Sequence, residues 1–248
     1  WDRYPERDAI LVGTQDQLLS RALNRGYSVS RFRWPIHFGL LNNDCLWVMD
    51  EVQLMGSGIA TTAQLQAFRH RFGNILPVKS VWMSATLDKK WLGTIDFADQ
   101  CTSLRALSLS DADKDFPGVS DRINATKPIT EADRSWDDFP GIADMILEAH
   151  RRGKRTLVIV NTVRRALQVY QALKRKKRKA AIVLVHSQFR PLDRQAALRR
   201  VLAEPGPEGT ICVATQVVEA GVDISASTLV TDLAPWPSLV QRFGRCNR

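Results

Sequence analysis

Two adjacent carboxylates, Asp50 and Glu51, follow a short apolar run at residues 46–49. A buried carboxylate without a partner is costly, so the pair needs a cation, a hydrogen-bond donor or an exit to the surface. A strand that ends in Asp-Glu suits nucleotide hydrolysis, because the aspartate can hold Mg²⁺ through water while the glutamate orients or deprotonates the attacking water. An isolated pair would instead be explained as two surface acids in a turn, so its neighbours must decide.

Further polar tracts stand at predicted strand ends or helix starts. Ser84-Ala85-Thr86 follows the next apolar strand, and ATQVVEAGVDI, residues 214–224, follows a strand in the second half of the chain. The last tract is QRFGRCNR, residues 241–248, on a predicted helix where Arg245 and Arg248 would share one face. Several tracts of this kind, in this order, are hard to explain as packing alone.

The elements that must position these tracts are β-branched apolar runs that alternate with helical patterns. Strands buried on both faces and joined by helices predict an α/β fold with parallel sheets flanked by helices. The carboxyl ends of such strands are where ligands gather. The predicted strands are residues 9–12, 46–49, 80–83, 156–160, 180–185, 210–214 and 227–233.

The stretch from residue 103 to residue 140 interrupts this alternation. It is rich in Asp, Ser and Pro, which indicates an interdomain connection, and we expect an edge strand at SLRALSL, residues 103–109. The predicted organisation is a first α/β domain at 1–102, a connector at 103–140 and a second α/β domain at 141–248.

The composition favours a soluble protein with a polyanionic partner. The chain has 35 basic and 26 acidic residues, a net charge of +9, although we interpret its densest basic run, residues 174–179, as the solvated end of a helix. No apolar stretch approaches the roughly 20 residues that cross a bilayer, and the first residues do not form a signal peptide. We therefore expect no membrane partner. The four cysteines lack CxxC spacing, which favours a reducing cytoplasm.

Together the tracts resemble the motifs of superfamily 2, the DExD/H-box nucleic-acid motors that are built from two RecA-like domains. The matching segments are GTQDQLL (13–19, motif Ib), DEVQ (50–53, motif II), SAT (84–86, motif III), VNT (160–162, motif IV), HSQF (186–189, its neighbour), ATQVVEAGVDI (214–224, motif V) and QRFGRCNR (241–248, motif VI). Within this superfamily, GTQDQLL, LLNNDCLWVMDEVQLMG, VHSQFRPLDR and EAGVDI are most similar to the helicase part of the signature helicase-nuclease of type I CRISPR systems. The pattern suggests the type I-U (I-G) branch.

The resemblance implies ATP and Mg²⁺ as cofactors and a role for each matching residue. Asp50 and Glu51 would serve the metal through water, and Glu51 would also activate the attacking water. The implied contacts to the nucleotide from the second domain come from Gly221 and Asp223 near the ribose, Gln241 at the water or phosphate, and Arg245 and Arg248 as arginine fingers. The implied contacts to the nucleic-acid backbone come from Thr14, Gln17, Asn161, Thr162, His186, Thr215 and Gln216. The residues implied to couple the two functions are Gln53, Ser84 and Thr86.

Several of these residues have a simpler explanation. Arg245 and Arg248 could form a solvated helix face, although Gln241 and Gly244 beside them disfavour this. His186 could be an ordinary histidine at a strand end. Thr14 and Gln17 could cap a helix that begins at Gln17. For His186, Thr14 and Gln17 the sequence leaves both explanations open.

The chain also departs from the family pattern. The phosphate-binding loop GxxxxGK[ST] is absent, because Gly153-Lys154 lacks both the earlier glycine and the following hydroxyl. The first residue is Trp1 and no capping residue follows Arg248, so we predict a fragment that does not hydrolyse ATP alone. Gln53 stands where family members often have His. The nuclease of the CRISPR family is expected outside this sequence.

The leading prediction is an ATP-dependent helicase or translocase of single-stranded nucleic acid, with DNA favoured, in CRISPR interference and antiviral defence. A CRISPR surveillance complex of the Cascade type would be its partner. The alternatives are an RNA or DNA-repair helicase of superfamily 2, and a non-hydrolysing RecA-like scaffold that binds nucleic acid. Retention of Glu51, Arg245 and Arg248 argues against the scaffold. The sequence leaves DNA versus RNA open.

Overall fold

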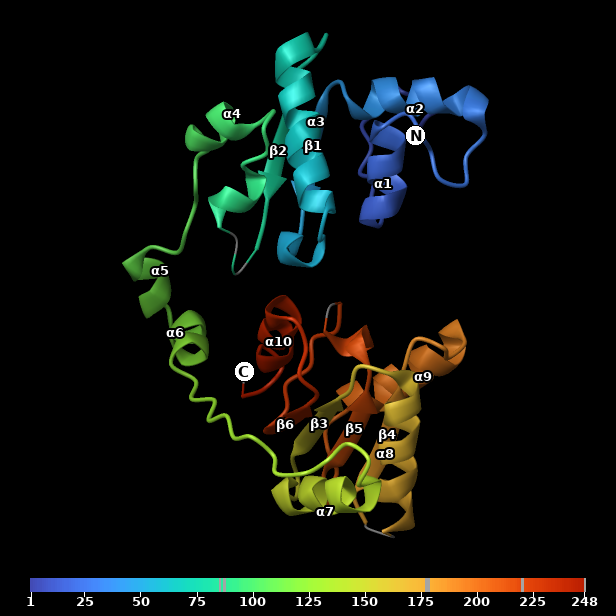
Figure 1. Ribbon diagram of the computed structural model, residues 1–248, viewed down its shortest axis with the longest axis vertical. Helices are drawn as coiled ribbons and strands as arrows, with labels where there is room; N and C mark the ends of the chain where they lie inside the picture. Colours follow the sequence, from blue (N-terminus) through green and yellow to red (C-terminus); the bar gives the residue numbers. More distant parts are fainter. Residues whose placement is uncertain (85, 87, 177–178, 220, 248) are drawn as a thin grey trace. The chain divides into compact units, whose positions relative to one another are not determined.

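The computed structural model describes residues 1–84, 86, 88–176, 179–219 and 221–247. The chain divides into two compact units, residues 1–107 and 108–248, coloured blue to green and green to red in Figure 1. Each unit holds a parallel sheet with flanking helices, so the predicted α/β fold class is confirmed. None of the helices within the described residues is both long and apolar enough to span a membrane.

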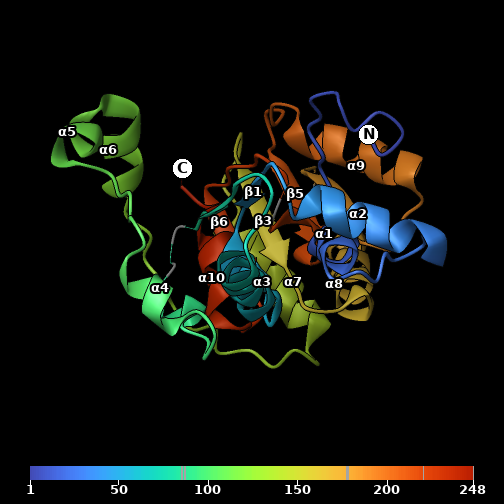
Figure 2. The same ribbon diagram turned by 90° about the horizontal axis from the view of Figure 1, so that it is seen from above.

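Unit 1 is built on two parallel strands joined by a long helix. The strands are β1 (Cys45–Met49) and β2 (Val78–Trp82), and the helix is α3 (Gly58–Phe72), which runs along the strands in Figure 1 and is seen end-on in Figure 2. Its other helical segments are α1 (Gln15–Ala22), α2 (Trp34–Leu41), α4 (Ala98–Thr102) and the 3-10 turns Arg31–Arg33, Val52–Leu54 and Lys89–Leu92.

The strands of unit 1 bury one face only. On the covered face, Met49 packs with Ile59 and Ala63 of α3. On the other face, Leu46 is 64% exposed and Val48 is 54% exposed. The expectation that this run is buried on both faces is wrong, because alternate strand residues point to opposite faces and the outer face of β1 is exposed in the described part of the chain.

Two of the predicted strands do not form. Residues 9–12 are irregular, with Ile10 and Val12 both 94% exposed, and residues 103–109 are irregular as well. Strand formation depends on a neighbouring strand and on burial more than on the residues themselves, and neither segment pairs with a sheet. The predicted connector also contains two short helices, α5 (Asp111–Asp115) and α6 (Pro117–Ile123).

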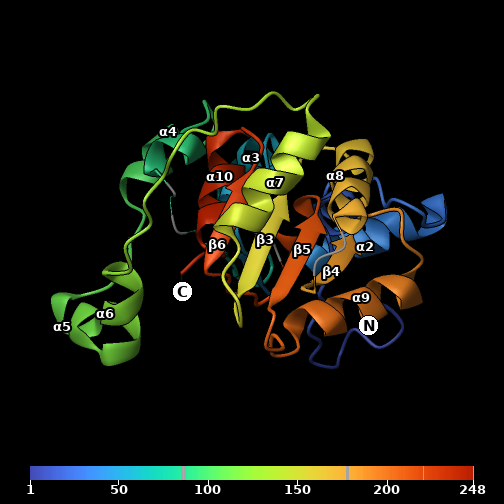
Figure 3. The ribbon, with the colours of Figure 1, turned by 90° about the horizontal axis from the view of Figure 1, so that it is seen from below.

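Unit 2 contains a four-stranded parallel sheet in the order β4-β5-β3-β6 (Figure 3). Its strands are β3 (Arg155–Ile159), β4 (Ala181–Val185), β5 (Thr210–Ala214) and β6 (Thr228–Thr231). Its remaining helices are α7 (Phe139–Ala149), α8 (Val163–Arg175), α9 (Pro191–Leu202), α10 (Trp236–Phe243) and the 3-10 turn Gln216–Val218.

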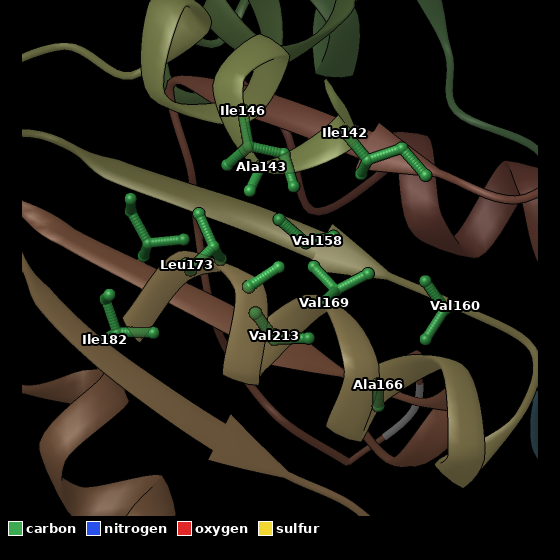
Figure 4. Packing of buried hydrophobic residues seen from close by; sticks show 12 residues of the cluster. Ile142, Ala143, Ile146, Val158, Val160, Ala166, Val169, Leu173, Ile182 and Val213 are labelled. Atoms are coloured by element: carbon green, nitrogen blue, oxygen red, sulfur yellow. The ribbon is translucent and has the colours of Figure 1, made fainter. Parts of the chain in front are cut away.

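Both faces of the unit 2 sheet are covered. On one face, Val158 and Val213 pack against α7 and α8, where Leu173 is fully buried (Figure 4). On the other face, Leu157 and Cys212 pack in a second cluster that includes residues of α9. Neighbouring residues of β3 thus point into different clusters, which is the pattern of a central parallel strand. The sequence prediction of strands buried on both faces is confirmed for β3 and β5.

Candidate functional site

Asp50 and Glu51 form a sharp turn at the carboxyl end of β1. Asp50 is exposed, and its Oδ1 accepts a hydrogen bond from the Glu51 backbone N–H at 2.9 Å. Glu51 has the left-handed angles φ 49° and ψ 47°. A residue with a side chain adopts these angles at an energetic cost, and such strain concentrates at functional sites. The turn places the two carboxylates just beyond the end of β1.

A chain of side-chain hydrogen bonds runs from Glu51 to Thr86. The Gln53 Nε2 donates to Glu51 Oε2 at 2.5 Å, and the Ser84 hydroxyl donates to Gln53 Oε1 at 2.5 Å. The backbone N–H of Thr86 donates to Ser84 Oγ at 3.0 Å. Gln53 is 7% exposed, so a buried amide connects the carboxylate after β1 to the hydroxyl after β2. The structure therefore brings together the residues that were predicted to couple the site.

The donor set at the end of β1 suits a weakly held Mg²⁺ ion. Within the described residues, no group of three or more His, Cys, Asp or Glu side chains lies close enough to hold a metal ion. Mg²⁺ commonly binds one or two carboxylates and takes its other ligands from water and substrate phosphates. The exposed Asp50 beside the half-buried Glu51 fits this pattern.

Thr14 and Gln17 lie at the start of α1. The helix begins at Gln15, two residues before the predicted start. Thr14 is its N-cap, and its Oγ1 accepts a hydrogen bond from the Gln17 backbone N–H at 3.4 Å. This contact supports the capping explanation for Thr14. Both side chains are exposed, so they are also accessible to a ligand.

In unit 2, predicted site residues gather where the parallel strands end. Asn161 follows β3 and Gln216 follows β5, and the Gln216 Nε2 donates to the Asn161 backbone carbonyl at 3.1 Å. Thr162 caps α8 by accepting from the Arg165 N–H at 3.2 Å. The carboxyl ends of neighbouring parallel strands meet at one edge of a sheet, which explains why these side chains lie close together.

His186 and Thr215 are less accessible than the prediction of a nucleic-acid contact requires. His186 is 6% exposed, and its ring lies 4.1 Å from that of Phe189. Burial lowers the pKa of His186, which favours the neutral ring at pH 7. Thr215 is 2% exposed. The explanation of His186 as an ordinary strand-end histidine fits this burial.

Arg245 does not lie on a helix. Helix α10 ends at Phe243, so Gln241 is in its last turn and Arg245 is in the turn that follows. The expectation that Arg245 and Arg248 share one helix face is wrong for Arg245, because the chain after Gly244 leaves the helix and Cys246 bridges to Ala226. The predicted role of Arg248 falls outside the described residues.

The Arg245 guanidinium contacts the segment that follows β5. Its Nη2 donates to the Glu219 backbone carbonyl at 2.7 Å. Gly221 and Asp223 lie in the same segment and are exposed, and Gly221 has a φ of +71°, which favours glycine. The predicted nucleotide-binding residues Gly221, Asp223 and Arg245 thus belong to adjoining segments of unit 2.

Sequence reasoning missed Arg242 and Glu219, which lie at the centre of this region. Arg242 is 1% exposed, and its Nε donates to Glu219 Oε1 at 2.7 Å. Its Nη2 donates to Asn161 Oδ1 at 2.8 Å, and its Nη1 donates to Thr231 Oγ1 at 2.8 Å. Arg242 stands three residues after Leu239, at a helical spacing that predicts an inward position. A buried arginine needs an acidic partner, so the inward position of Arg242 could have predicted a nearby carboxylate.

Comparison with known proteins finds a family match in the C-terminal part of the chain. Residues 152–248 match the family described as CRISPR-associated nuclease/helicase Cas3, C-terminal. The CRISPR-associated helicase Cas3 of Thermoproteus tenax is 39% identical over 98 residues, which is 39% of this chain and 17% of that protein. A putative CRISPR-associated nuclease/helicase Cas3 of Myxococcus xanthus is 40% identical over 106 residues, 42% of this chain and 14% of that protein. The chain therefore spans only a small part of these curated relatives.

Solved structures resemble the chain over most of its length. The crystal structure of T. fusca Cas3 with ATP has a TM-score of 0.61 at 20% identity and covers 86% of this chain and 28% of that chain. A chain of a pre-nicking CRISPR RNA-guided surveillance complex has a TM-score of 0.65 at 21% identity, over 100% of this chain and 33% of that chain. The DUF1998 helicase MrfA bound to DNA and AMPPNP has a TM-score of 0.58 at 17% identity, over 100% of this chain and 34% of that chain. At these identities the likeness establishes the fold.

The two units share with these solved Cas3 and helicase structures a fold of parallel sheets flanked by helices. The family match over residues 152–248 and the curated relatives agree in a similarity to Cas3-type helicases. The resemblance to the helicase part of the CRISPR helicase-nuclease is confirmed, and its type I-U (I-G) branch stays a prediction.

Proposed function

We propose that this chain is the motor part of an ATP-dependent helicase or translocase that acts on single-stranded DNA in CRISPR interference. The observation that carries the proposal is the hydrogen-bonded chain from Glu51 through Gln53 and Ser84 to Thr86. It links the carboxylate after β1 to the hydroxyl after β2 through the Gln53 amide. Such a fixed carboxylate suits the activation of water, because catalysis depends on a base that is already oriented.

ATP hydrolysis would use residues from both units. Asp50 would hold hydrated Mg²⁺, which when bound offsets the charge of the phosphates. Glu51 would accept a proton from the attacking water or orient it. On the side of unit 2, Arg245 and Arg248 would stabilise charge at the γ-phosphate and Gln241 would orient the water or the phosphate. The residues proposed at the ribose are Gly221 and Asp223.

Short neutral side chains would contact the nucleic-acid backbone. Thr14, Gln17 and Gln216 are exposed, and Asn161 is half-buried at a strand end. Such groups bond to phosphates and sugars without reading sequence, which suits a motor that moves along any strand. DNA is favoured because the similar MrfA structure contains DNA and the relatives are CRISPR-associated proteins. An RNA substrate is the outcome that would replace it.

The setting of this activity belongs to the same proposal. The similar chain from a surveillance complex supports a Cascade-type complex as partner, with a nuclease domain outside this sequence. We place the protein in the cytoplasm, in antiviral defence, and keep the type I-U (I-G) branch as a prediction. Since the sequence has no GxxxxGK[ST] tract to grip the phosphates, we propose that this chain alone does not hydrolyse ATP.

The test is the substitution Glu51→Gln in a full-length protein that carries this sequence. We expect the rate of DNA-stimulated ATP hydrolysis to fall by about 10²- to 10⁴-fold, because the variant lacks the base, while ATP binding persists. Steady-state hydrolysis and binding of a fluorescent ATP analogue measure the two effects.

Glu6→Gln is the matched control, because the Glu6 side chain is 65% exposed and forms an ion pair with Arg7, at 3.9 Å, away from the proposed site residues. It should hydrolyse ATP like the wild type. Wild-type hydrolysis by Glu51→Gln would refute the role of Glu51. A wild-type protein that hydrolyses no ATP with any nucleic acid would refute the motor itself.

A further inference from the structure

Arg242 and Glu219 form a buried ion pair, and the motif resemblance implies no role for either residue. We propose that this pair is the link through which nucleic-acid binding at unit 2 sets the position of Arg245. Both are positioning residues in this account, and the inference rests on the proposed motor function. It assigns the coupling within unit 2 to a specific set of side chains.

The pair is enclosed and well oriented. The side chains of Arg242 and Glu219 are 1% and 7% exposed, and the distance from Nε to Oε1 is 2.7 Å. Arg242 also donates through Nη1 to the Asp232 backbone carbonyl at 3.1 Å, in addition to Thr231. A guanidinium is a rigid planar fork, so donors fixed at three of its edges leave it little freedom to rotate. Movement of one partner is therefore transmitted to the others.

One end of the link lies at the proposed nucleic-acid contacts. The exposed Gln216 donates to the Asn161 backbone carbonyl, and the Asn161 side-chain oxygen accepts from Arg242. The Asn161 backbone N–H donates to Asp232 Oδ2 at 2.8 Å, which fixes the same segment from its other side. A phosphate that bonds to Gln216 or Asn161 would disturb Asn161, whose side chain accepts from Arg242.

The other end of the link lies at the proposed ATP contact. Glu219 receives Arg242 on its carboxylate and Arg245 on its backbone carbonyl, at 2.7 Å in both cases. The two arginines therefore hold opposite ends of one residue. If Glu219 shifts with Arg242, the acceptor that holds Arg245 shifts as well. Energetic coupling travels through contiguous hydrogen-bond networks, so nucleic-acid binding at one end of this network would shift the group at its other end.

The test is Glu219→Gln in the full-length protein, which keeps the shape of the side chain and removes its charge. The readout is the ratio of ATP hydrolysis rates with and without saturating oligo-dT. We expect this ratio to fall by about fivefold or more. A role in stability alone would lower both rates together and leave the ratio unchanged.

Asp144→Asn is the matched control. Asp144 of α7 accepts a hydrogen bond from Lys176 at 2.7 Å, in an ion pair that touches none of the motifs. Its loss should leave the ratio at the wild-type value. A wild-type ratio in folded Glu219→Gln would overturn the link.

If Glu219→Gln does not fold by circular dichroism, Thr231→Val replaces it, since Thr231 is an acceptor of Arg242 that is not among the proposed nucleic-acid contacts. Its ratio at saturating oligo-dT should fall in the same way, and an unchanged ratio would overturn the link. If the wild-type protein shows no stimulation by oligo-dT, the proposed function fails first and the link fails with it. Stimulation of the wild-type protein by oligo-dT thus tests the proposed function, and the ratio of the variant tests the link.

Discussion

Both units carry polar side chains at the ends of parallel strands, but their sheets differ in the number of strands and in apolar packing. In unit 2 the sheet has four strands and apolar clusters on both faces. In unit 1 it has two strands, and Leu46 and Val48 of β1 face outward and are exposed. Burial of apolar surface is the main source of stability, so unit 2 has the stronger framework beneath its site.

The buried arginines of the two units show the same difference. Arg242 in unit 2 is paired with the carboxylate of Glu219. Arg69 in unit 1 is 6% exposed and donates to Asn42 Oδ1 at 2.8 Å, and within the described residues no carboxylate lies in ion-pair distance of it. Burial lowers the pKa of Arg69 to about 10. A buried cation held by neutral groups is costly, so unit 2 balances its internal charge better than unit 1.

The largest expected effect on stability is in the core of unit 2. Leu173→Ala removes a fully buried side chain from the cluster in Figure 4. It should lower the free energy of unfolding of unit 2 by about 2–5 kcal/mol, because a cavity remains where the side chain was. Hydrogen exchange of the β3 and β5 amides measures this loss separately from unit 1.

The counterpart in unit 1 is Leu46→Thr, on the exposed face of β1. Its effect on exchange of the β1 and β2 amides should stay within about 0.5 kcal/mol, because the side chain is 64% exposed and threonine suits a strand. A cost equal to that of Leu173→Ala would contradict the contrast between the units.

The smallest expected effect is a pH dependence from His186. Burial lowers its pKa below the ordinary value of 6.5, so below about pH 6.5 the unfolded state binds a proton that the folded state does not. The free energy of unfolding of unit 2 should therefore fall as the pH drops below this value and stay level above it. Urea unfolding at several pH values between about 5 and 8, a range that brackets the ordinary His pKa, measures how the free energy of unfolding changes with pH. If His186→Gln shows the same slope, His186 is not its source.

The sequence predicted unit 2 better than unit 1 for a physical reason. Runs such as residues 156–160 and 210–214 are apolar throughout, and a parallel strand between two helical layers requires that pattern. Residues 9–12 and 103–109 look similar locally but do not pair with a sheet. Strand formation there depends on distant partners, which a local pattern does not contain.

The sequence predicted the positions of several site residues but few of the contacts between them. Motif spacing placed Asp50, Gln53 and Ser84 at strand ends, and the structure joins Gln53 and Ser84 directly. Motif spacing did not predict the turn after Gly244 or the contact of Arg242 with Glu219. These features depend on tertiary packing, which brings together segments that lie 23 residues apart in this case.

The proposal that most needs a test is that Arg245 of unit 2 and Glu51 of unit 1 both serve ATP hydrolysis. Its most direct test is the rate of ATP hydrolysis by full-length Arg245→Ala with saturating single-stranded DNA, beside Arg164→Ala at an exposed position on α8. We predict a loss of about 10³-fold or more for Arg245→Ala, by analogy with isolated arginine fingers, and near wild-type turnover for the control. Equal turnover by the two variants would contradict it.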